Sequence, residues 1–549
     1  MADKIAIQCR APLLWLVFPL IVGYILARIS PIERPVWLLI FALPFIAITW
    51  FLLRPNSQKL WAVCFIVGII ALAWSYFLLR WDEPAADWKV LPPREAELSL
   101  EVTEPFDTGQ RFNRTSGLAK VVGAPLHLSD LIGLRVFFDL ELHPDETRAI
   151  RSTQWAVRGV LSYFDTQASD SSFHRYLNSR GVFFQLNRGL VVGVEQPANV
   201  FFQFCAEQNQ RLEALLRRSS EGHTRLADVA VAMLLGKKSA LSREQKDVFL
   251  ETGVMHLFAI SGLHVGVIAM ILFHLLGLIR LPRPLIWVLG LLLLLLYVFT
   301  TGGRPSALRA FSMVAFFWGA YAFRQKNSPF SALLASALVV LIVDPTQLWN
   351  AGFQMSYAVV ASIFLYGLPL SELLCNRLKL FVGLPQELWQ WQQRLLQTGL
   401  KGTLSLFAVG LGAWMMSTPL SIHYFNVFAP GALALNLMLL PLATGVIICC
   451  FLALLFGLIS LVELTSFWNH GAWLLIAIME NSLQWSQESY LWFSRRVWLA
   501  PWFAFATTFI LFCTLLIGHS HRYIRFSGTY IAPLILLCLL VLAFTQAVG

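Results

Sequence analysis

Apolar residues form two blocks along the chain, and a long polar interval separates them. Three apolar runs come first, near residues 11–29, 36–53 and 60–79. A polar interval follows at about residues 80–253, and a larger apolar block extends from about residue 254 onward. A helix needs roughly 20 apolar residues to cross a hydrocarbon layer about 30 Å thick, and most of these runs approach that length. The pattern predicts a polytopic α-helical membrane protein with a polar domain inserted between two groups of spans.

The second block predicts some ten spans, which brings the expected total to about 13. These spans are expected to begin near residues 254, 285, 307, 329, 351, 401, 431, 466, 501 and 528. The run at residues 429–462 is too long for one straight span at about 1.5 Å per residue. Pro441 within this run predicts a half-helix followed by a full one.

Inside the polar interval the apolar period is two, which predicts strands. The expected strands lie at residues 95–103, 118–122, 133–142, 155–163, 182–186 and 190–194. Asn187, Arg188 and Gly189 separate the last two and predict a hairpin turn. A short helix at residues 172–179 interrupts the strands. Five or six short strands with one helix predict a small β-barrel of the oligonucleotide-binding type (OB-like).

The residues after the barrel predict helices with one apolar face. Residues 201–218 and 224–235 have this pattern, and Ser242 to Gln245 predicts a capping box that opens a third helix. The expected domains are three N-terminal transmembrane helices at residues 1–80, an OB-like β domain at 81–200, amphipathic helices at the membrane surface at 201–253, and a transmembrane channel domain at 254–549.

Composition and charge agree with lipid as the solvent and suggest an orientation. The chain is 57% hydrophobic and 13% charged, against about 25% charged in an ordinary soluble domain. With the N-terminus inside, the short cytoplasmic loops carry fourteen Lys and Arg residues and the short outer loops six. This bias predicts a cytoplasmic N-terminus, with the β domain and the C-terminus outside the cell membrane. The net charge of +10 fits cytoplasmic loops and a nucleic-acid partner equally well.

One segment at the start of the large apolar block combines polar and small residues. It contains His256, Ser261, Gly262, His264 and Gly266. Such groups cost free energy in a membrane unless they line water or pair with another group. The two glycines predict a hinge or a close approach by another backbone. The bland interpretation, in which His256 lies at the interface and His264 binds a neighbouring helix, stays open.

This segment resembles the signature of the ComEC family of competence proteins. The family pattern is His-Leu-x-Ala-Ile-Ser-Gly-Leu-His-Val, and the chain has His256-Leu-Phe-Ala-Ile-Ser-Gly-Leu-His-Val265. Other pieces match in the family's order, namely Met233-Leu-Leu-Gly-Lys-Lys-Ser-Ala-Leu-Ser242, Gly303-Arg-Pro-Ser-Ala-Leu-Arg-Ala310, Asp344-Pro-Thr-Gln-Leu-Trp-Asn-Ala-Gly-Phe-Gln-Met-Ser356, Pro419 to Phe425, and Asn436 to Pro441.

The resemblance implies an inner-membrane channel for the uptake of single-stranded DNA during natural transformation. Implied partners are single-stranded DNA, membrane lipid, a DNA receptor protein outside, and a cytoplasmic ATPase or single-strand-binding protein inside. Many family members carry a C-terminal metallo-β-lactamase-like domain, and this sequence is expected to be a short form without it. No enzymatic activity, catalytic residue, cofactor or metal ligand set is therefore predicted.

A conduit for a single strand needs spaced cations, small polar walls and aromatic rings for stacking. The predicted channel residues are His256, Ser261, Gly262, His264, Gly266, Arg304, Arg309, Gln354, Ser356 and Asn436. The predicted DNA-binding residues of the barrel are Arg111, Phe112, Arg114, Lys120 and Arg135. Solvated surface charge is an equally good interpretation of the barrel cations. Asp344 with Pro345 is expected to end a span rather than to bind an ion.

Two other classes of protein remain open. An intramembrane serine hydrolase would use Ser261 as nucleophile and His264 as base, although a base usually approaches from another element. A secondary transporter of another anionic substrate would use broken helices at the bilayer midplane.

Overall fold

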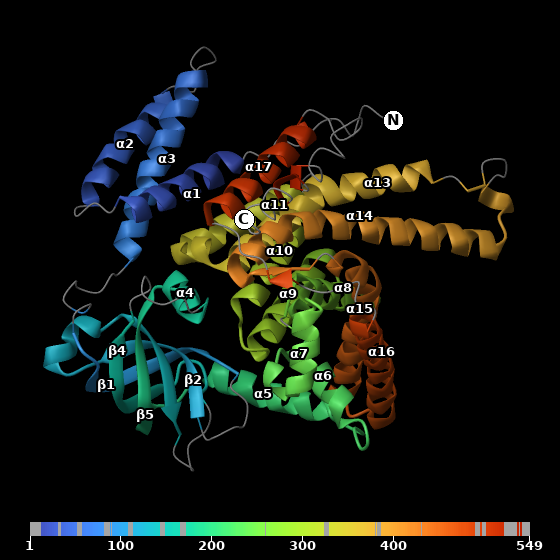
Figure 1. The fold of residues 1–549 in the computed structure, drawn as a ribbon, viewed down its shortest axis with the longest axis horizontal. Coiled ribbons are helices and arrows are strands. Elements are labelled where there is room, and N and C mark those ends of the chain that lie inside the picture. The colour runs from blue at the N-terminus through green and yellow to red at the C-terminus, as the bar shows by residue number, and fades with distance from the viewer. Residues whose placement is uncertain are drawn as a thin grey trace.

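The computed structural model describes most of the chain, from Leu13 to residue 540 (Figure 1). The described residues are 13–30, 35–51, 58–81, 88, 91–107, 114–142, 149–164, 172–258, 260–322, 329–378, 380–381, 386–429, 431–488, 495–496, 501–520, 535–536 and 538–540.

Three N-terminal helices occupy the positions that the first apolar runs predict. They are α1 (Leu14–Ile29), α2 (Val36–Phe51) and α3 (Gln58–Arg80). A Cβ on Gly23 of α1 would lie 2.5 Å from the carbonyl oxygen of Ile70 in α3, so the glycine allows close packing of these two helices. The Tyr24 hydroxyl donates a hydrogen bond of 3.0 Å to the Leu341 carbonyl and so joins this group to the larger helical block.

A closed five-stranded barrel follows, as the alternating pattern predicts. Its strands are β1 (Arg94–Pro105), β2 (Arg114–Gly123), β3 (Arg135–Glu141), β4 (Gln154–Tyr163) and β5 (Val182–Gln196), in the order β1-β2-β3-β5-β4. All neighbouring pairs are antiparallel except β3 and β5. The inward positions form one apolar core that includes Leu100, Phe138, Trp155 and Phe184. Helix α4 (Ser172–Ser179) has the predicted bounds and joins β4 to β5.

The predicted hairpin at residues 187–189 is wrong, because β5 is one continuous strand. Arg188 has a φ of 50°, and the pairing register with β4 shifts between Arg158 and Val160. A Cβ on Gly189 would lie 2.4 Å from the Arg158 carbonyl oxygen. The glycine therefore permits a bulge at a close strand contact, where the sequence pattern indicates a turn.

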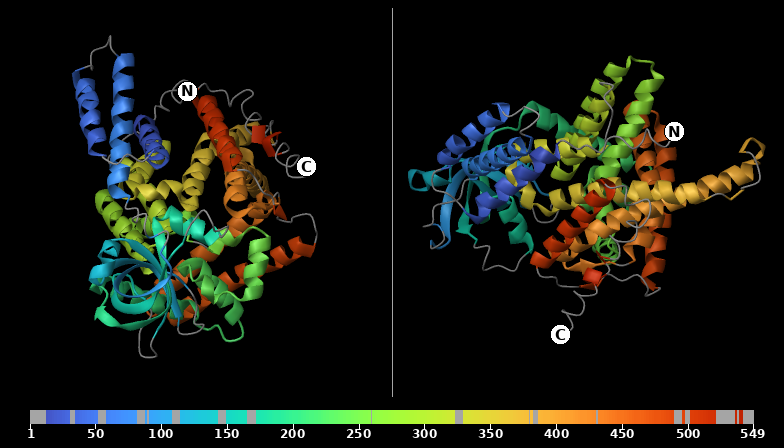
Figure 2. Two further views of the ribbon diagram at one scale, coloured as in Figure 1. Left: turned by 60° about the vertical axis from the view of Figure 1, so that its left-hand side comes forward. Right: turned by 90° about the horizontal axis from the view of Figure 1, so that it is seen from above.

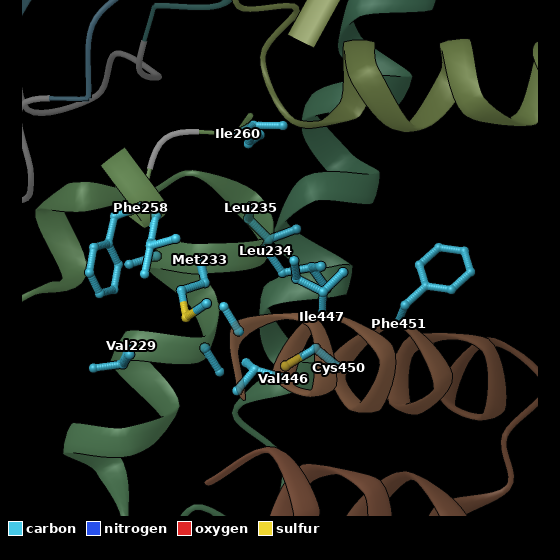
Figure 3. Packing of buried hydrophobic residues seen from close by; sticks show 14 of the residues in the cluster. Val229, Met233, Leu234, Leu235, Phe258, Ile260, Val446, Ile447, Cys450 and Phe451 are labelled. Atoms are coloured by element: carbon cyan, nitrogen blue, oxygen red, sulfur yellow. The ribbon is translucent and has the colours of Figure 1, made fainter. Parts of the chain in front are cut away.

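Three short helices connect the barrel to the membrane helices. They are α5 (Val200–Leu216), α6 (Thr224–Leu235) and α7 (Arg243–Glu251), close to the predicted ranges, and the Ser242–Gln245 capping box is present. Helix α6 differs from the amphipathic pattern, because every residue from Val229 to Leu235 is buried. It packs against α15 (Ala432–Leu458), and one buried apolar cluster includes Val229 and Met233 of α6 with Val446 and Cys450 of α15 (Figure 3). Helix α6 is thus part of the core.

The large apolar block folds into a bundle of long helices. They are α8 (Gly262–Leu278), α9 (Arg283–Thr300), α10 (Pro305–Ala322), α11 (Pro329–Val343), α12 (Ala351–Ser362), α13 (Leu368–Arg377), α14 (Trp391–Phe425), α15, α16 (Val462–Glu488) and α17 (Pro501–Ser520). Helices α12 and α13 join through a π-helical turn at Ile363–Gly367. Among the described residues, five helices are long and apolar enough to span a membrane, and five more are apolar but shorter. The protein is therefore a helical membrane protein with a small barrel domain.

Two expectations for this block need correction. The span expected to begin near residue 254 begins at Gly262, and the preceding residues form a short 3-10 helix, Met255–Phe258. The half-helix expected at Pro441 is wrong, since α15 continues through this proline from Ala432 to Leu458. Neighbouring helices can compensate for the hydrogen bond that a proline removes inside a membrane helix. Most of the last expected span lies outside the described residues.

The barrel lies at one end of the molecule, and α4 is on the side of the barrel that faces the helices (Figure 1). Helix α4 contacts the 3-10 helix Pro345–Trp349, which follows α11. Helices α13 and α14 run side by side and project away from the barrel (Figure 2, right). The barrel therefore covers one end of the helical block only.

Candidate functional site

The signature segment ends in the first turn of α8, where Ser261 and His264 contact each other. Ser261 is the N-cap residue, and its Oγ lies 3.0 Å from Nδ1 of His264. The backbone N–H of Ser261 also points at this nitrogen, at 3.4 Å. The imidazole replaces the Glu or Gln side chain that usually completes a capping box. The three-residue spacing between Ser261 and His264 therefore allows the two side chains to cap the N-terminus of α8.

His264 is fully buried, and the far side of its ring lacks a partner. Because Nδ1 accepts from Ser261, the ring proton is assigned to Nε2. The Nε2 atom is buried and has no hydrogen-bond partner among the described residues. A buried donor of this kind calls for a water or an acceptor from a bound molecule. His256 lies close enough to interact electrostatically with His264, and its Nδ1 is 3.1 Å from the Gly253 carbonyl oxygen.

The two glycines of the segment face open space. A Cβ on Gly262 or on Gly266 would meet no atom within 4 Å. The predicted close approach of another backbone is therefore wrong for both positions within the described part of the chain. The open space beside Gly262 adjoins Ser261 at the start of α8.

Helix α10 contributes the two predicted arginines, Arg304 just before its first residue and Arg309 in its second turn. Arg309 is 4% exposed, and its Nε and Nη1 atoms have no hydrogen-bond partner in the described ranges. Its Nη2 lies 3.0 Å from the place that a Cβ on Gly352 would take, so this glycine at the start of α12 makes room for the guanidinium. Ser312 and Tyr357 lie near it, but hydroxyls do not neutralise a cation. Burying a charge without a counter-charge is expensive, so the arrangement suits an anion.

The predicted polar residues of α12 and α15 have different surroundings. Gln354 is satisfied, since its Nε2 donates to the Leu348 carbonyl and its Oε1 accepts from the Tyr424 hydroxyl, both at 2.8 Å. Ser356 is half-buried. The Oδ1 of Asn436 is buried without a partner among the residues described. Gln354 therefore holds α12 against α14. Asn436 resembles His264 and Arg309, because each has a buried polar atom without a hydrogen-bond partner among the described residues.

These residues share a position in the fold, because each lies within two turns of a helix N-terminus. Ser261 and His264 open α8, Arg304 and Arg309 open α10, and Asn350 caps α12 through a 2.8 Å bond to the Gly352 N–H. Helix α8 packs against α10 and α15, and α10 packs against α12. Each N-terminus carries about half a positive charge from its peptide dipoles. The N-termini of α8, α10 and α12, with their polar side chains, form what is called the mouth below, and the mouth attracts anions.

Two residues that were not predicted from the sequence also belong to this region, Lys238 and Gly236, and a Cβ on Gly236 would lie 3.4 Å from Nη1 of Arg304. They lie in the matching piece Met233 to Ser242, where the consecutive lysines were the available signal. Burial and the positive charge of Arg304 lower the pKa of Lys238. The neighbouring Lys237 instead forms a 2.6 Å ion pair with Glu213. Lys238 thus adds a second cation beside Arg304.

The barrel is held against this region by a short contact. Asp107, in the loop after β1, accepts hydrogen bonds from the backbone N–H and the hydroxyl of Ser239, at 2.9 and 2.5 Å. Arg180, directly after α4, forms a buried 2.6 Å ion pair with Glu104 and lies close enough to Arg309 for electrostatic interaction. Burial opposes the charge of Arg180, yet Glu104 keeps its pKa above the ordinary value.

The predicted DNA-binding residues of the barrel are not all alike. Arg114 pairs with Asp139 at 3.1 Å, whereas Lys120 and Arg135 stand opposite each other on β2 and β3. Arg111 and Phe112 lie outside the described residues. Asp344 caps the 3-10 helix Pro345–Trp349 through Thr346, in agreement with its expected role at the end of a span.

A protein-family model described as "Competence protein" matches residues 233–521, which is more than half of the chain. The chain belongs to the Competence protein family. The matched range includes every predicted channel residue, and it begins after the barrel and α5. Membership therefore agrees with the resemblance that the signature segment carries.

Individual relatives match between 41% and 50% of the chain. ComE operon protein 3 of Bacillus subtilis (strain 168) is 28% identical over 275 residues, which are 50% of this chain and 31% of that protein. Recombination protein 2 of Haemophilus influenzae is 24% identical over 234 residues, 41% of this chain and 28% of that protein. An uncharacterized protein of Aquifex aeolicus is 30% identical over 260 residues, 47% of this chain and 52% of that protein. The chain thus spans less than a third of the length of the first two relatives, and no solved structure matches it.

Proposed function

We propose that this Competence protein family member is a channel of the cell inner membrane that takes up single-stranded DNA during natural transformation. The strand enters at the mouth, on the barrel side of the helical block, and its phosphates pass the N-termini of α8, α10 and α12. The chain cleaves no bond and uses no cofactor; it supplies a path. A DNA receptor outside delivers the strand, and a cytoplasmic ATPase or single-strand-binding protein draws it inward.

The buried guanidinium of Arg309, whose Nε and Nη1 atoms have no partner among the described residues, is the observation that carries this proposal. An ion pair would satisfy a structural arginine, whereas Arg309 has buried nitrogens without partners in the described structure. The Nε2 atom of His264 and the Oδ1 atom of Asn436 share this property. A strand of phosphodiesters and bases offers both acceptors and donors, one nucleotide after another. A transient partner suits conduction, because a group that binds too tightly would hold its cargo.

The remaining features extend the same proposal. The closed order β1-β2-β3-β5-β4 supports a barrel of the OB type, a fold in which strands 2 and 3 often bind oligonucleotides. The twelve helical segments supplied by α1–α3 and α8–α17, with α12 and α13 counted as one, support about 13 spans if a further one follows α17. We place the N-terminus in the cytoplasm and the barrel outside, on the charge bias of the short loops.

The test is the uptake of fluorescent DNA into the cytoplasm of cells that carry Arg309→Gln. This variant keeps a polar side chain but removes the charge, so uptake should fall at least about tenfold, equivalent to about 1.4 kcal/mol. Arg309→Lys, which keeps the charge without the planar guanidinium, should retain more uptake than Arg309→Gln. Arg158→Gln, an exposed barrel residue on β4, is the matched control and should behave as wild type. Equal uptake by Arg309→Gln and wild type, at equal protein amounts in the membrane, would contradict the proposal.

A further inference from the structure

A pocket of about 280 Å³ lies where the barrel meets the ends of α3 and α11. Its walls come from three parts of the chain that are distant in sequence. Arg80 ends α3, Lys120 and Arg135 lie on β2 and β3, and Asp344 follows α11. At about 30 Å³ for each water, the pocket has room for a phosphate group together with several waters.

The pocket carries an excess of positive charge. Its ionisable lining groups are Arg80, Lys120, Arg135, Arg180 and Asp344. Arg180 is neutralised by Glu104 at 2.6 Å, which leaves three cations and one carboxylate, a net charge of +2. The Asp344 carboxylate accepts hydrogen bonds from Thr346 and Gln347, which offset its burial and, with the charges of Arg135 and Arg180, keep its pKa below the usual range.

Two of these cations are placed against each other. Lys120 and Arg135 are directly opposite residues in the β2–β3 ladder, and like charges in such positions destabilise a sheet. Arg135 donates one hydrogen bond to the Arg180 carbonyl, at 3.2 Å, and neither residue forms an ion pair in the part of the chain that the structure describes. A bound anion between the two side chains would turn this repulsion into attraction.

The rim of the pocket is apolar and faces outward. Leu79 and Val343 line it, and they are 52% and 67% exposed. They lie in the last turns of α3 and α11, two of the apolar helices. Exposed leucine and valine at the end of a membrane helix are covered by acyl chains. The exposed cations Arg80, Lys120 and Arg135 therefore line the same pocket as apolar residues at the ends of two apolar helices.

We propose that this pocket binds one anionic phospholipid, with the headgroup phosphate between Lys120 and Arg135 and the acyl chains along Leu79 and Val343. The bound lipid joins the barrel to the membrane at the side where α3 ends. This site goes beyond the proposed channel, because it does not require that DNA pass through the protein. It also takes two of the predicted DNA-binding residues, Lys120 and Arg135, for a different anion. A nucleic acid shares the phosphodiester but lacks the acyl chains that the apolar rim fits.

The test uses the full-length protein, purified in detergent and depleted of lipid. Dioleoylphosphatidylglycerol is titrated in, and native mass spectrometry measures its binding while thermal unfolding measures its stabilising effect. Lys120→Gln combined with Arg135→Gln should weaken apparent affinity at least about tenfold, since each cation near an anionic surface contributes roughly fivefold. Arg158→Gln, on a strand that lines no part of the pocket, should bind as wild type does. If the double variant does not fold, Lys120→Gln alone should still show a loss of about fivefold.

Parallel titrations separate the sources of the phosphate. Inorganic phosphate and glycerophosphoglycerol, which lack acyl chains, should give no comparable stabilisation, and an oligothymidylate should not displace the lipid. The proposal is overturned if the lipid binds the double variant as it binds wild type. It is equally overturned if the chain-free phosphates match the lipid, or if the oligothymidylate alone loses affinity in the double variant. Since none of these readouts measures DNA uptake, failure here leaves the proposed channel function to its own test.

Discussion

Several described helices contain a buried polar atom without a partner, and at the mouth such atoms belong to a charged side chain, Arg309. A buried donor or acceptor that has no hydrogen-bond partner costs about 1–3 kcal/mol of folding free energy, and more when the group is charged. The mouth includes such atoms on His264 and Arg309. Gln354, which the sequence pattern selects with equal strength, is satisfied by Tyr424, 70 residues away. Sequence spacing can therefore suggest polar residues in a membrane segment, but only the folded arrangement tells which of them lack partners.

Ser261 is the residue on which channel and hydrolase make opposite predictions. Its hydroxyl contacts His264 Nδ1 at 3.0 Å within one turn of α8, as part of a helix cap. Ser261→Ala should therefore cost about 0.5–2 kcal/mol of stability, the usual effect of losing an N-cap. DNA uptake should stay within about tenfold of wild type, a change of about 1.4 kcal/mol or less. Uptake per molecule of protein in the membrane, measured beside thermal unfolding, checks both numbers.

A nucleophile could not be replaced in this way, because alanine has no oxygen that attacks. The His264→Gln variant is the second test. Glutamine can still form hydrogen bonds, so this variant should retain part of the DNA uptake. A complete loss of uptake in both variants, with the protein folded and present at normal amount, would favour covalent chemistry over a passive conduit.

At the scale of single elements, local sequence patterns predict a helix or strand correctly wherever nearby residues determine its structure. Four strands, α4 and the Ser242 cap follow from alternation and capping residues that lie within a few positions of each other. The errors occur where distant packing decides. Gly189 indicates a turn in the sequence. In the structure a glycine is needed there because the Arg158 carbonyl of β4 lies too close to β5 for a side chain. Pro441 indicates a break, but α15 continues through it.

Helix α6 illustrates the same limit. Its sequence has polar residues at the start, which favour a surface helix, yet α5, α15 and α16 pack against it. Lys238, three residues after its end, lies close enough to Arg304 for the two positive charges to repel each other. The sequence of the twelve residues of α6 alone does not predict which other helices will pack around it.

The start of α8 has open space, and this makes a direct test of the conduit possible. A side chain added at Gly262 meets no atom within 4 Å, so Gly262→Leu should not overpack the fold. In the proposed channel the leucine narrows the mouth, and uptake should fall at least about tenfold, a barrier increase of about 1.4 kcal/mol. Uptake of labelled DNA, normalised to membrane protein, gives the measurement.

Gly277→Leu is the matched control, because this glycine lies at the other end of α8 and also has free space around it. Its uptake should equal that of wild type. If both variants conduct normally, the space beside Gly262 is not part of the path. If Gly262→Leu lowers the protein amount instead, the segment is structural.

At the scale of the whole molecule, several contacts fix the barrel relative to the helices. Asp107 bonds Ser239 on one side, and α4 contacts the turn after α11 on the other. Tyr76 of α3 donates a 2.5 Å hydrogen bond to the Ile342 carbonyl of α11, which places the helix before the barrel beside that same turn. The barrel therefore lies close to the starts of α10 and α12, because Arg151 approaches Gly303 just before α10 and α4 contacts the turn that precedes α12. A strand bound by the barrel would be delivered directly to the mouth.

This arrangement makes membrane orientation the decisive property of the whole chain, because the barrel can receive incoming DNA only if it lies outside. Leu126, between β2 and β3, is 96% exposed, and Leu388, near the tip of the α13–α14 pair, is 67% exposed. The tip projects away from the barrel, so the two positions should lie on opposite sides of the membrane (Figure 2).

A thiol reagent that cannot cross membranes should label Leu126→Cys in intact spheroplasts, and Leu388→Cys only after lysis. Wild type, with its eight native cysteines, sets the background. Labelling of Leu388→Cys alone in intact spheroplasts would place the barrel in the cytoplasm. The helix N-termini of the mouth would then face the cytoplasm, and the chain would have to be an exit path or a different kind of transporter.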